Sequence, residues 1–132
     1  MTVKQADLAR RALDLYRNDS LRKAFAGVDP TQMRTLLAAF EQAGSLEEQE
    51  IVLRYQAARQ RDKWDPKLVD KLLELCRDAG KGVERASAGG DPDERKAREA
   101  ARQLGFIVRM HRVAVADAET KRGEGDRQGK GR

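Results

Sequence analysis

Each of the three prolines in this chain follows an aspartate, and each Asp-Pro pair precedes a run of residues with helical periodicity. The pairs begin at Asp29, Asp65 and Asp91. An aspartate at this position can accept hydrogen bonds from the free N–H groups of a first helical turn. Proline suits the first helical position because it has no N–H to satisfy. This repeated signal predicts three helices with well-defined starts, and it constrains the fold more than any other feature.

Capping-box patterns and apolar spacing predict the other helices and their buried faces. Ser45 followed by Glu48, and Asp29 followed by Gln32, match the capping-box pattern. Apolar residues recur every three or four positions, so each helix should bury one stripe. The expected stripes are Val3, Ala6, Ala9, Leu13 and Tyr16 after a Thr2 cap; Leu21, Ala24 and Phe25; Met33, Leu36, Leu37, Phe40 and Ala43; Ile51, Val52, Tyr55 and Ala58 in a helix running to about Lys63; Leu68, Val69, Leu72, Leu73 and Cys76 up to Gly80; and Ala97, Ala101, Leu104, Val108, His111 and Val115.

The length of 132 residues suits one domain, and strand-forming residues are sparse. We therefore expect an all-α fold, a compact bundle of five or six helices spanning residues 1–119. A segment rich in Gly, Lys, Ser and Ala at about 80–90 is expected to be a flexible connector. Residues 120–132 contain four glycines and no large apolar residue, and are expected to form a disordered basic tail.

The positive charge is concentrated in this tail. The formal net charge of the chain is +5, and the tail contributes +3 of it through five basic and two acidic residues. The remaining +2 belongs to residues 1–119. If the folded part binds a polyanion, it must use a local group of arginines rather than its bulk charge.

The residue inventory argues against an enzyme or a metal site. The chain has one histidine, His111, and one cysteine, Cys76, and both fall on apolar stripes. We interpret them as buried structural residues, although a Cys–His nucleophile pair is conceivable between facing helices. A zinc ligand set and a glycine-rich phosphate loop are both missing, so no metal and no cofactor is expected.

The same inventory bears on location. One cysteine cannot form an internal disulfide, no apolar run approaches the length of a membrane span, and the first residues lack the apolar region of a signal peptide. We therefore expect a cytoplasmic protein with no membrane partner.

Arginines are the residues best suited to a binding function, because the planar guanidinium can donate two hydrogen bonds to one phosphate. Arg54 and Arg61 are seven residues apart and share one helical face; Arg59 and Lys63 are four apart and share another. One pair could bind a polyanion while the other forms local ion pairs, for instance Arg59 with Asp62. Further arginines flank other stripes: Arg34, Arg102, Arg109 and Arg112.

The alternative for all these arginines is an ordinary solvated surface with ion pairs, which the nearly balanced charge of residues 1–119 favours. Aromatic stacking on bases has little support. Phe40 and Tyr55 lie on expected apolar stripes, and Trp64 is expected to pack over a helix junction. Binding would therefore involve the sugar-phosphate backbone and would be largely independent of sequence.

Three segments together resemble one known family. They are residues 30–37, with Pro-Thr-Gln-Met-Arg followed by Leu-Leu; residues 53–59, Leu-Arg-Tyr-Gln-Ala-Ala-Arg; and residues 106–112, Phe-Ile-Val-Arg-Met-His-Arg. They are similar, in order and in helical setting, to the small helical subunit of type III (Csm-type) CRISPR-Cas effector complexes. The resemblance covers about residues 21–115. The chain departs from the family at Arg109-Met110, where members often have Ala-Tyr, and the first helix and the tail have no clear counterpart.

This resemblance implies a non-catalytic role. Members of the family are helical bundles that associate side by side and line the duplex of guide RNA and target RNA, while other subunits of the complex carry the catalysis. Arg34, Arg54, Arg59, Arg109 and Arg112 fall in the matching motifs and are implied RNA-binding residues. Arg61 and Lys63 join them from helical geometry alone.

Two other classes of protein stay open. The chain could be a protein-only helical adaptor or oligomeric scaffold whose arginines form surface ion pairs. It could also be a helical DNA-binding protein, since Ala43-Gly44-Ser45 joins two helices as in a helix-turn-helix motif. Against that, the second helix would begin with Glu47, Glu48 and Glu50, which would face phosphates.

Overall fold

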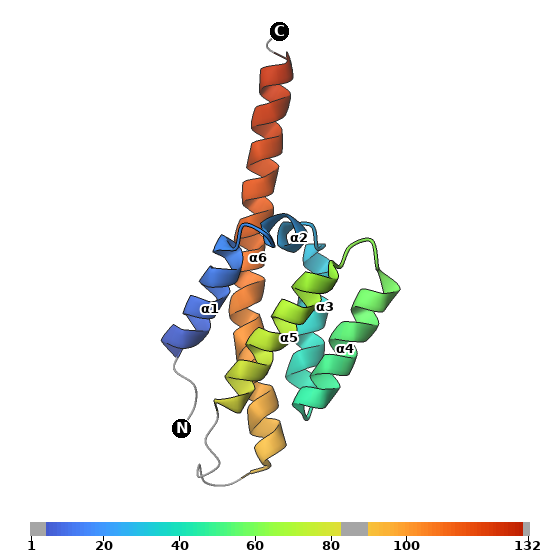
Figure 1. Cartoon of the computed structure of the whole chain (residues 1–132), viewed down its shortest axis with the longest axis vertical. Helices are drawn as coiled ribbons and strands as arrows, with labels where there is room; N and C mark the ends of the chain where they lie inside the picture. Colours follow the sequence, from blue (N-terminus) through green and yellow to red (C-terminus); the bar gives the residue numbers. More distant parts are fainter. Residues whose placement is uncertain (1–4, 83–89, 131–132) are drawn as a thin grey trace.

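A computed structural model describes residues 5–82 and 90–130, with side chains described as far as Thr120. Within these residues the chain forms six α-helices and no strand (Figure 1). The helices are α1 (Gln5–Arg17), α2 (Arg22–Ala26), α3 (Pro30–Gln42), α4 (Leu46–Arg59), α5 (Pro66–Lys81) and α6 (Pro92–Lys130). The predicted all-α bundle is confirmed.

Helix α6 is the central element of the bundle. It packs against each of the other five helices, most extensively against α5, α1 and α3, and extends past the bundle at its far end (Figure 1). A helix covered on several sides buries more than one stripe, and Ala100, Gln103 and Ile107 are fully buried beside the predicted residues. Val108 and Val115 of the predicted stripe are only half-buried.

Several predictions concern residues that the structure does not describe, or features that it does not test. The expected Thr2 cap and Val3 fall among residues 1–4, and most of the expected connector is residues 83–89. The backbone of α6 is helical to Lys130, beyond the predicted end of the bundle at Glu119. Disorder of residues 120–132 stays a prediction.

The aspartate caps form as predicted. The side-chain Oδ1 of each aspartate accepts a hydrogen bond from the backbone N–H two residues later, with N···O distances of 2.7 Å for Asp29, 2.8 Å for Asp65 and 2.9 Å for Asp91. Each bond satisfies one free donor of a first helical turn. The starts of α3, α5 and α6 are therefore fixed by interactions local to the sequence.

The two capping boxes differ from prediction in their second hydrogen bond. Ser45 Oγ accepts from the N–H of Glu48 at 3.1 Å, as expected, but the Glu48 carboxylate accepts from the N–H of Gly44 at 2.8 Å. Gln32 does not close a box on Asp29. Its side-chain oxygen instead accepts from the amide of Gln56 in α4 at 2.6 Å, which ties α3 to α4.

The predicted stripes of α3 and α5 are confirmed at their centres, whereas that of α1 is wrong. Helix α1 buries Leu8, Ala12 and Leu15, while Ala6 is exposed. Both sets have helical spacing in this Ala- and Leu-rich helix. The buried set contains two leucines, Leu8 and Leu15, whereas the predicted set contains one, Leu13.

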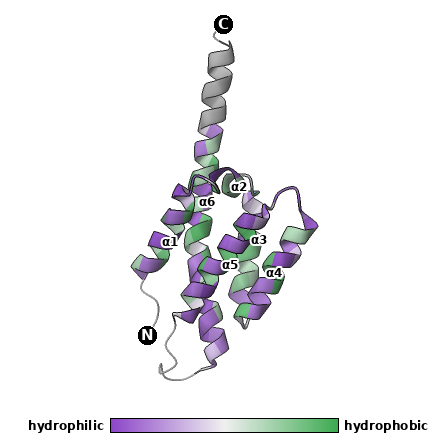
Figure 2. Ribbon diagram, viewed as in Figure 1, coloured by the Kyte–Doolittle hydropathy of each residue, from purple (hydrophilic) through white to green (hydrophobic). Residues whose placement is uncertain are grey.

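The largest error concerns α4. The predicted stripe included Ile51 and Tyr55, which are 67% and 64% exposed. The buried residues are Gln49 and Leu53, and the helix ends at Arg59 rather than near Lys63. Gln49 is buried because its amide donates to the carbonyl oxygens of Phe40 at 3.1 Å and Ala97 at 2.8 Å. A polar residue on the inner face made the apolar pattern misleading. Figure 2 shows hydrophobic and hydrophilic residues mixed along α4.

Gly80 lies inside α5 instead of ending it. A Cβ at this position would come within 2.8 Å of Leu46 Cδ2 and 2.9 Å of the Lys96 carbonyl oxygen. Helices α4, α5 and α6 therefore meet closely because residue 80 has no side chain. Trp64, at the junction before α5, is buried as predicted.

Candidate nucleic-acid interface

The predicted RNA-binding cations are all exposed, and most of them form no ion pair with the described part of the chain. Among the described residues, only Arg54 of the set forms one, with Glu50 at 2.7 Å. The exposed members without such a partner are Arg34, Arg59, Arg61, Lys63, Arg109 and Arg112. Ion pairs among the described residues therefore account for one predicted cation, and the others are exposed as either a solvated surface or a binding surface would be.

Arg54 belongs to a network between two helices. Glu50 on α4 accepts from Arg54 on the same helix and from Arg77 on α5. One carboxylate between two guanidiniums leaves the network with a net positive charge. It also fixes the position of the Arg54 guanidinium beside the next helix.

Arg54 and Arg61, which were predicted to act as a pair, lie at the same site in the folded protein. Both line a shallow hollow of about 390 Å³ between α4 and the start of α5, together with Trp64 and Asp70. Arg61 lies past the end of α4, so the helical spacing that motivated the pair is not the reason for its position. The chain after Arg59 turns toward α5, and this turn directs Arg61 to the hollow.

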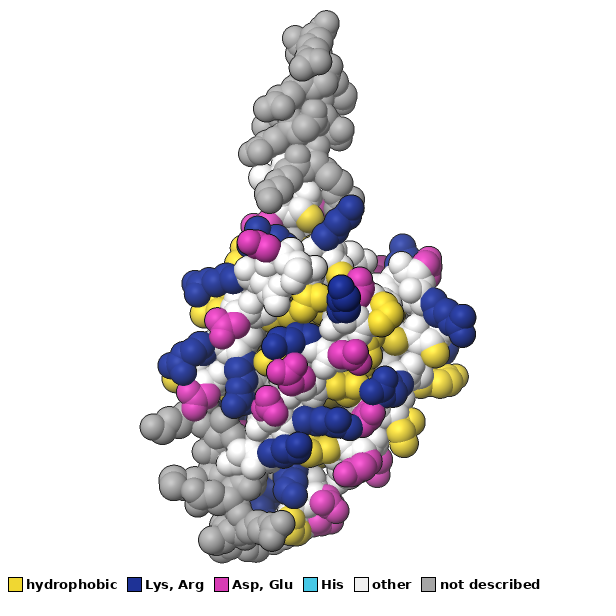
Figure 3. Space-filling view, in the orientation of Figure 1, with side chains coloured by type: hydrophobic (Ala, Val, Ile, Leu, Met, Phe, Trp, Pro, Cys, Tyr) yellow, Lys and Arg dark blue, Asp and Glu magenta, His cyan; other side chains and the backbone are white. Residues whose placement is uncertain are grey.

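Arg59 lies on the outer face of α4, next to the exposed aromatic ring. Its guanidinium carbon is 5.7 Å from the centroid of the Tyr55 ring, a cation–π distance. The suggested ion pair of Arg59 with Asp62 is not among the described contacts. The expectation that Tyr55 belongs to the core is wrong, and together with Ile51 it forms an exposed apolar edge at the side of the bundle (Figure 3).

Arg109 lies in a different groove. This groove, of about 710 Å³, runs along α6 opposite the last turn of α3 and the first residue of α1. The Arg109 guanidinium carbon is 5.1 Å from the centroid of the Phe106 ring. Two arginines outside the predicted set, Arg98 and Arg102, line the same groove. Their spacing to Arg109 on one helical face was a signal available in the sequence.

Lys63, Arg34 and Arg112 complete the set, and Lys63 is exposed in the turn between α4 and α5. Arg34, on α3, donates to the hydroxyl of Thr31 at 3.4 Å, and Arg112 lies on α6 beside His111. Neither lines the hollow of Arg54 or the groove of Arg109. The predicted residues thus form two basic sites and separate surface positions rather than one continuous patch. On the face seen in Figure 3, basic and acidic side chains alternate.

The histidine and the cysteine are buried, as predicted. His111 Nε2 donates to the carbonyl oxygen of Val28 at 2.8 Å, and its ring meets Phe25 edge to face at a centroid distance of 5.3 Å. Burial lowers the pKa of His111, so the neutral ring predominates at neutral pH. Burial raises the pKa of the Cys76 thiol to about 12, which keeps it protonated and a poor nucleophile.

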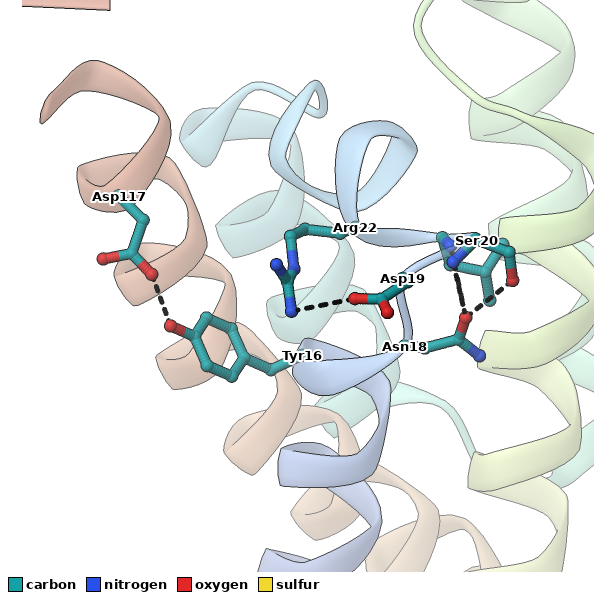
Figure 4. Close-up of polar contacts among 7 residues, drawn as sticks. Tyr16, Asn18, Asp19, Ser20, Arg22 and Asp117 are labelled. Carbon is teal, nitrogen blue, oxygen red and sulfur yellow. Dashed lines mark hydrogen bonds and ion pairs between the residues drawn. The ribbon is translucent and has the colours of Figure 1, made fainter. Parts of the chain in front are cut away.

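A third hollow lies where α6 leaves the bundle. It has a volume of about 520 Å³ and is lined by Ala114 and Ala118 of α6 and by residues of α1 and α2. At its edge Tyr16 donates to the Asp117 carboxylate, which raises the pKa of the Tyr16 hydroxyl, and Arg22 pairs with Asp19 at 3.2 Å (Figure 4). None of the predicted RNA-binding residues lines this hollow.

The described part of the chain also bears on metal binding and on membrane insertion. There, no group of three or more His, Cys, Asp or Glu side chains is arranged to hold a metal ion. No helix among the same residues is long and apolar enough to cross a membrane.

No family model, curated protein sequence or solved structure matches this chain. A function for this protein is therefore inferred from its own residues, their arrangement in the bundle and their motif resemblance.

Proposed function

We propose that this protein is a non-catalytic, RNA-binding small subunit of a type III CRISPR effector complex. In this role it lines the duplex of guide RNA and target RNA in the cytoplasm through sequence-independent backbone contacts. The observation that carries the proposal is the set of exposed cations that lack ion-pair partners among the described residues, with Arg59 on the outer face of α4 and Arg61 just past its end. Guanidiniums without a carboxylate keep their hydrogen-bond donors for phosphate.

The exposed apolar edge formed by Ile51 and Tyr55 supports the protein contacts that the role requires. Such a subunit associates side by side with further copies and contacts larger subunits of the complex. Large apolar side chains exposed together are typical of surfaces that contact another protein. This same edge favours a second candidate function, a protein-only adaptor that binds no RNA.

Co-purification tests the proposal most directly. A tagged copy expressed in its native host should recover larger protein subunits together with short guide RNA of uniform origin. An adaptor would recover proteins alone. Recovery of proteins without RNA, under low-salt conditions that preserve phosphate contacts, would count against the RNA-binding role.

A matched pair of double variants tests the residues. Arg59→Glu with Arg61→Glu reverses two cations near α4, and Arg10→Glu with Arg17→Glu makes the same change in net charge on α1. We expect the first pair to reduce affinity for single-stranded RNA by about 100-fold, from about 1.5 kcal/mol per lost contact, and to flatten its salt dependence. The α1 pair should reduce the affinity for RNA by much less. Equal losses in both would mean that only bulk charge matters.

A further inference from the structure

The groove along α6 has features that the predicted binding residues do not explain. Its volume of about 710 Å³ falls within the range typical of ligand sites. The helical face that forms its floor carries Arg98, Arg102, Gly105 and Arg109, and Phe106 flanks this face. Of these, only Arg109 was among the residues predicted from the sequence.

Gly105 keeps the floor of this groove open. It lies within α6, where glycine destabilises a helix relative to alanine, yet a Cβ at this position would meet nothing within 4 Å. Position 80 differs, because neighbouring atoms lie within 3 Å of where a Cβ would be and leave no space for it. Helix packing therefore requires glycine at position 80 but not at position 105. The absence of a side chain at Gly105 deepens a groove that no other described part of the protein fills.

The arginines along the floor are arranged in a line. At a rise of about 1.5 Å per residue, Arg102 follows Arg98 by about 6 Å, and Arg109 follows Arg102 by about 10 Å. Arg102 is oriented by the buried Glu99, whose carboxylate accepts from it at 2.7 and 2.8 Å. Arg98 has no ion-pair partner among the described residues. One compact anion cannot contact all three guanidiniums, whereas a chain of successive phosphates can.

The acidic residues of the groove restrict how such a chain can lie. Glu94 lies one turn before Arg98 and ends the basic line, and Glu41 and Gln42 line the groove from α3. The carboxylates repel phosphate, whereas carboxylate and amide oxygens accept hydrogen bonds from ribose hydroxyls and base amino groups. The lining fits a nucleotide chain whose phosphates follow α6 and whose sugars and bases face α3.

We propose that the α6 groove is a second RNA site, which holds a short single-stranded segment through phosphate contacts with Arg98, Arg102 and Arg109 above the open floor at Gly105. This inference rests on the proposed RNA-binding role and adds a location to it. The groove is lined by α1, α3 and α6, whereas the hollow of Arg54 and Arg61 is lined by α4 and α5.

Filling the groove tests the proposal without changing charge. Gly105→Leu adds a side chain over the floor, and Gly105→Ala is its matched control, since a Cβ alone meets no neighbour. Binding of the full chain to a labelled single-stranded RNA is measured by fluorescence anisotropy at low salt. We expect Gly105→Leu to weaken binding about tenfold, as for one lost charge-assisted contact, and Gly105→Ala to leave it within about twofold. Arg98→Glu provides a second variant if Gly105→Leu alters folding.

The possible outcomes separate this site from the broader role. If Gly105→Leu and Arg98→Glu both bind RNA like the parent while Arg59→Glu with Arg61→Glu does not, the groove proposal is overturned and the RNA-binding role stands. If uridine monophosphate competes with the RNA as well as a longer strand does, the site takes a compact anion and the proposed linear arrangement is wrong. If the groove variants lose co-purifying subunits but not RNA, the groove binds protein instead. If the parent chain binds no RNA even within its complex, both proposals fail.

Discussion

Glycines 80 and 105 lie in different helices and are expected to respond in opposite ways to alanine. Gly80→Ala should lower the free energy of unfolding by about 1–3 kcal/mol, because its Cβ would press on Leu46 and on the Lys96 carbonyl at under 3 Å. Gly105→Ala should raise it by up to about 1 kcal/mol, because alanine is the better helix former and meets no neighbour. Urea denaturation followed by circular dichroism measures both. Destabilisation of both variants would show that residue 105 is also tightly packed.

His111 is expected to make stability depend on pH in a narrow window. Burial is the main cause that lowers its folded pKa below the usual 6.5, with a smaller contribution from Arg112, against opposing effects of the Val28 hydrogen bond and of Asp29. The unfolded chain therefore takes up the proton first as the pH falls. Above about pH 7, His111 should not affect the free energy of unfolding. As the pH drops below about 6.5, His111 should lower that free energy by at most about 1.4 kcal/mol per pH unit.

His111→Gln is the control for this prediction, because His111 is the one histidine of the chain and carboxylates titrate at lower pH. The variant should be less stable overall yet show a flatter dependence between pH 7 and pH 5. Denaturation curves at several pH values, with the imidazole resonance followed by NMR in the parent, provide the measurement. Equal slopes in the two proteins would contradict a buried neutral imidazole.

At the scale of a single helix, α4 distinguishes residues that stabilise the fold from residues that are free for binding. Leu53 is fully buried and Tyr55, two residues later, is 64% exposed. Leu53→Ala should lower the free energy of unfolding by about 2–5 kcal/mol, whereas Tyr55→Ala should change it by less than about 0.5 kcal/mol. Thermal or urea denaturation compares the two. A large loss for Tyr55→Ala would mean that the tyrosine is covered in the folded protein.

For the whole molecule, the prediction concerns the basic tail. Removing residues 120–132 lowers the formal charge from +5 to +2. We expect the truncated chain to keep its thermal midpoint within about 2 °C, since the buried residues described all precede this segment. Its affinity for RNA should fall mainly at low salt, where each phosphate contact contributes about 0.7 to the logarithmic salt slope. A truncated chain that fails to fold would contradict the predicted boundary at Glu119.

The helix starts and two of the buried faces were determined by the sequence alone. An aspartate that accepts a hydrogen bond from the N–H two residues later caps its helix independently of tertiary contacts. The starts of α3, α5 and α6 therefore followed from local chemistry. The stripes of α3 and α5 were also correct, because each has one strongly apolar side. The predicted cations are exposed and the pairing of Arg54 with Arg61 was anticipated, whereas the grouping of Arg98, Arg102 and Arg109 in one groove was not.

Only the tertiary structure decided which face of each helix is covered and where the basic side chains meet. Gln49 is buried because carbonyl oxygens of Phe40 and Ala97, distant in sequence, satisfy its amide, and this turned Ile51 and Tyr55 outward. The groove of Arg98, Arg102 and Arg109 likewise exists because α3 ends and α1 begins beside α6. Capping depends on neighbours within one turn of the chain. Burial and grooves depend on which distant helix lies opposite, which no local pattern specifies.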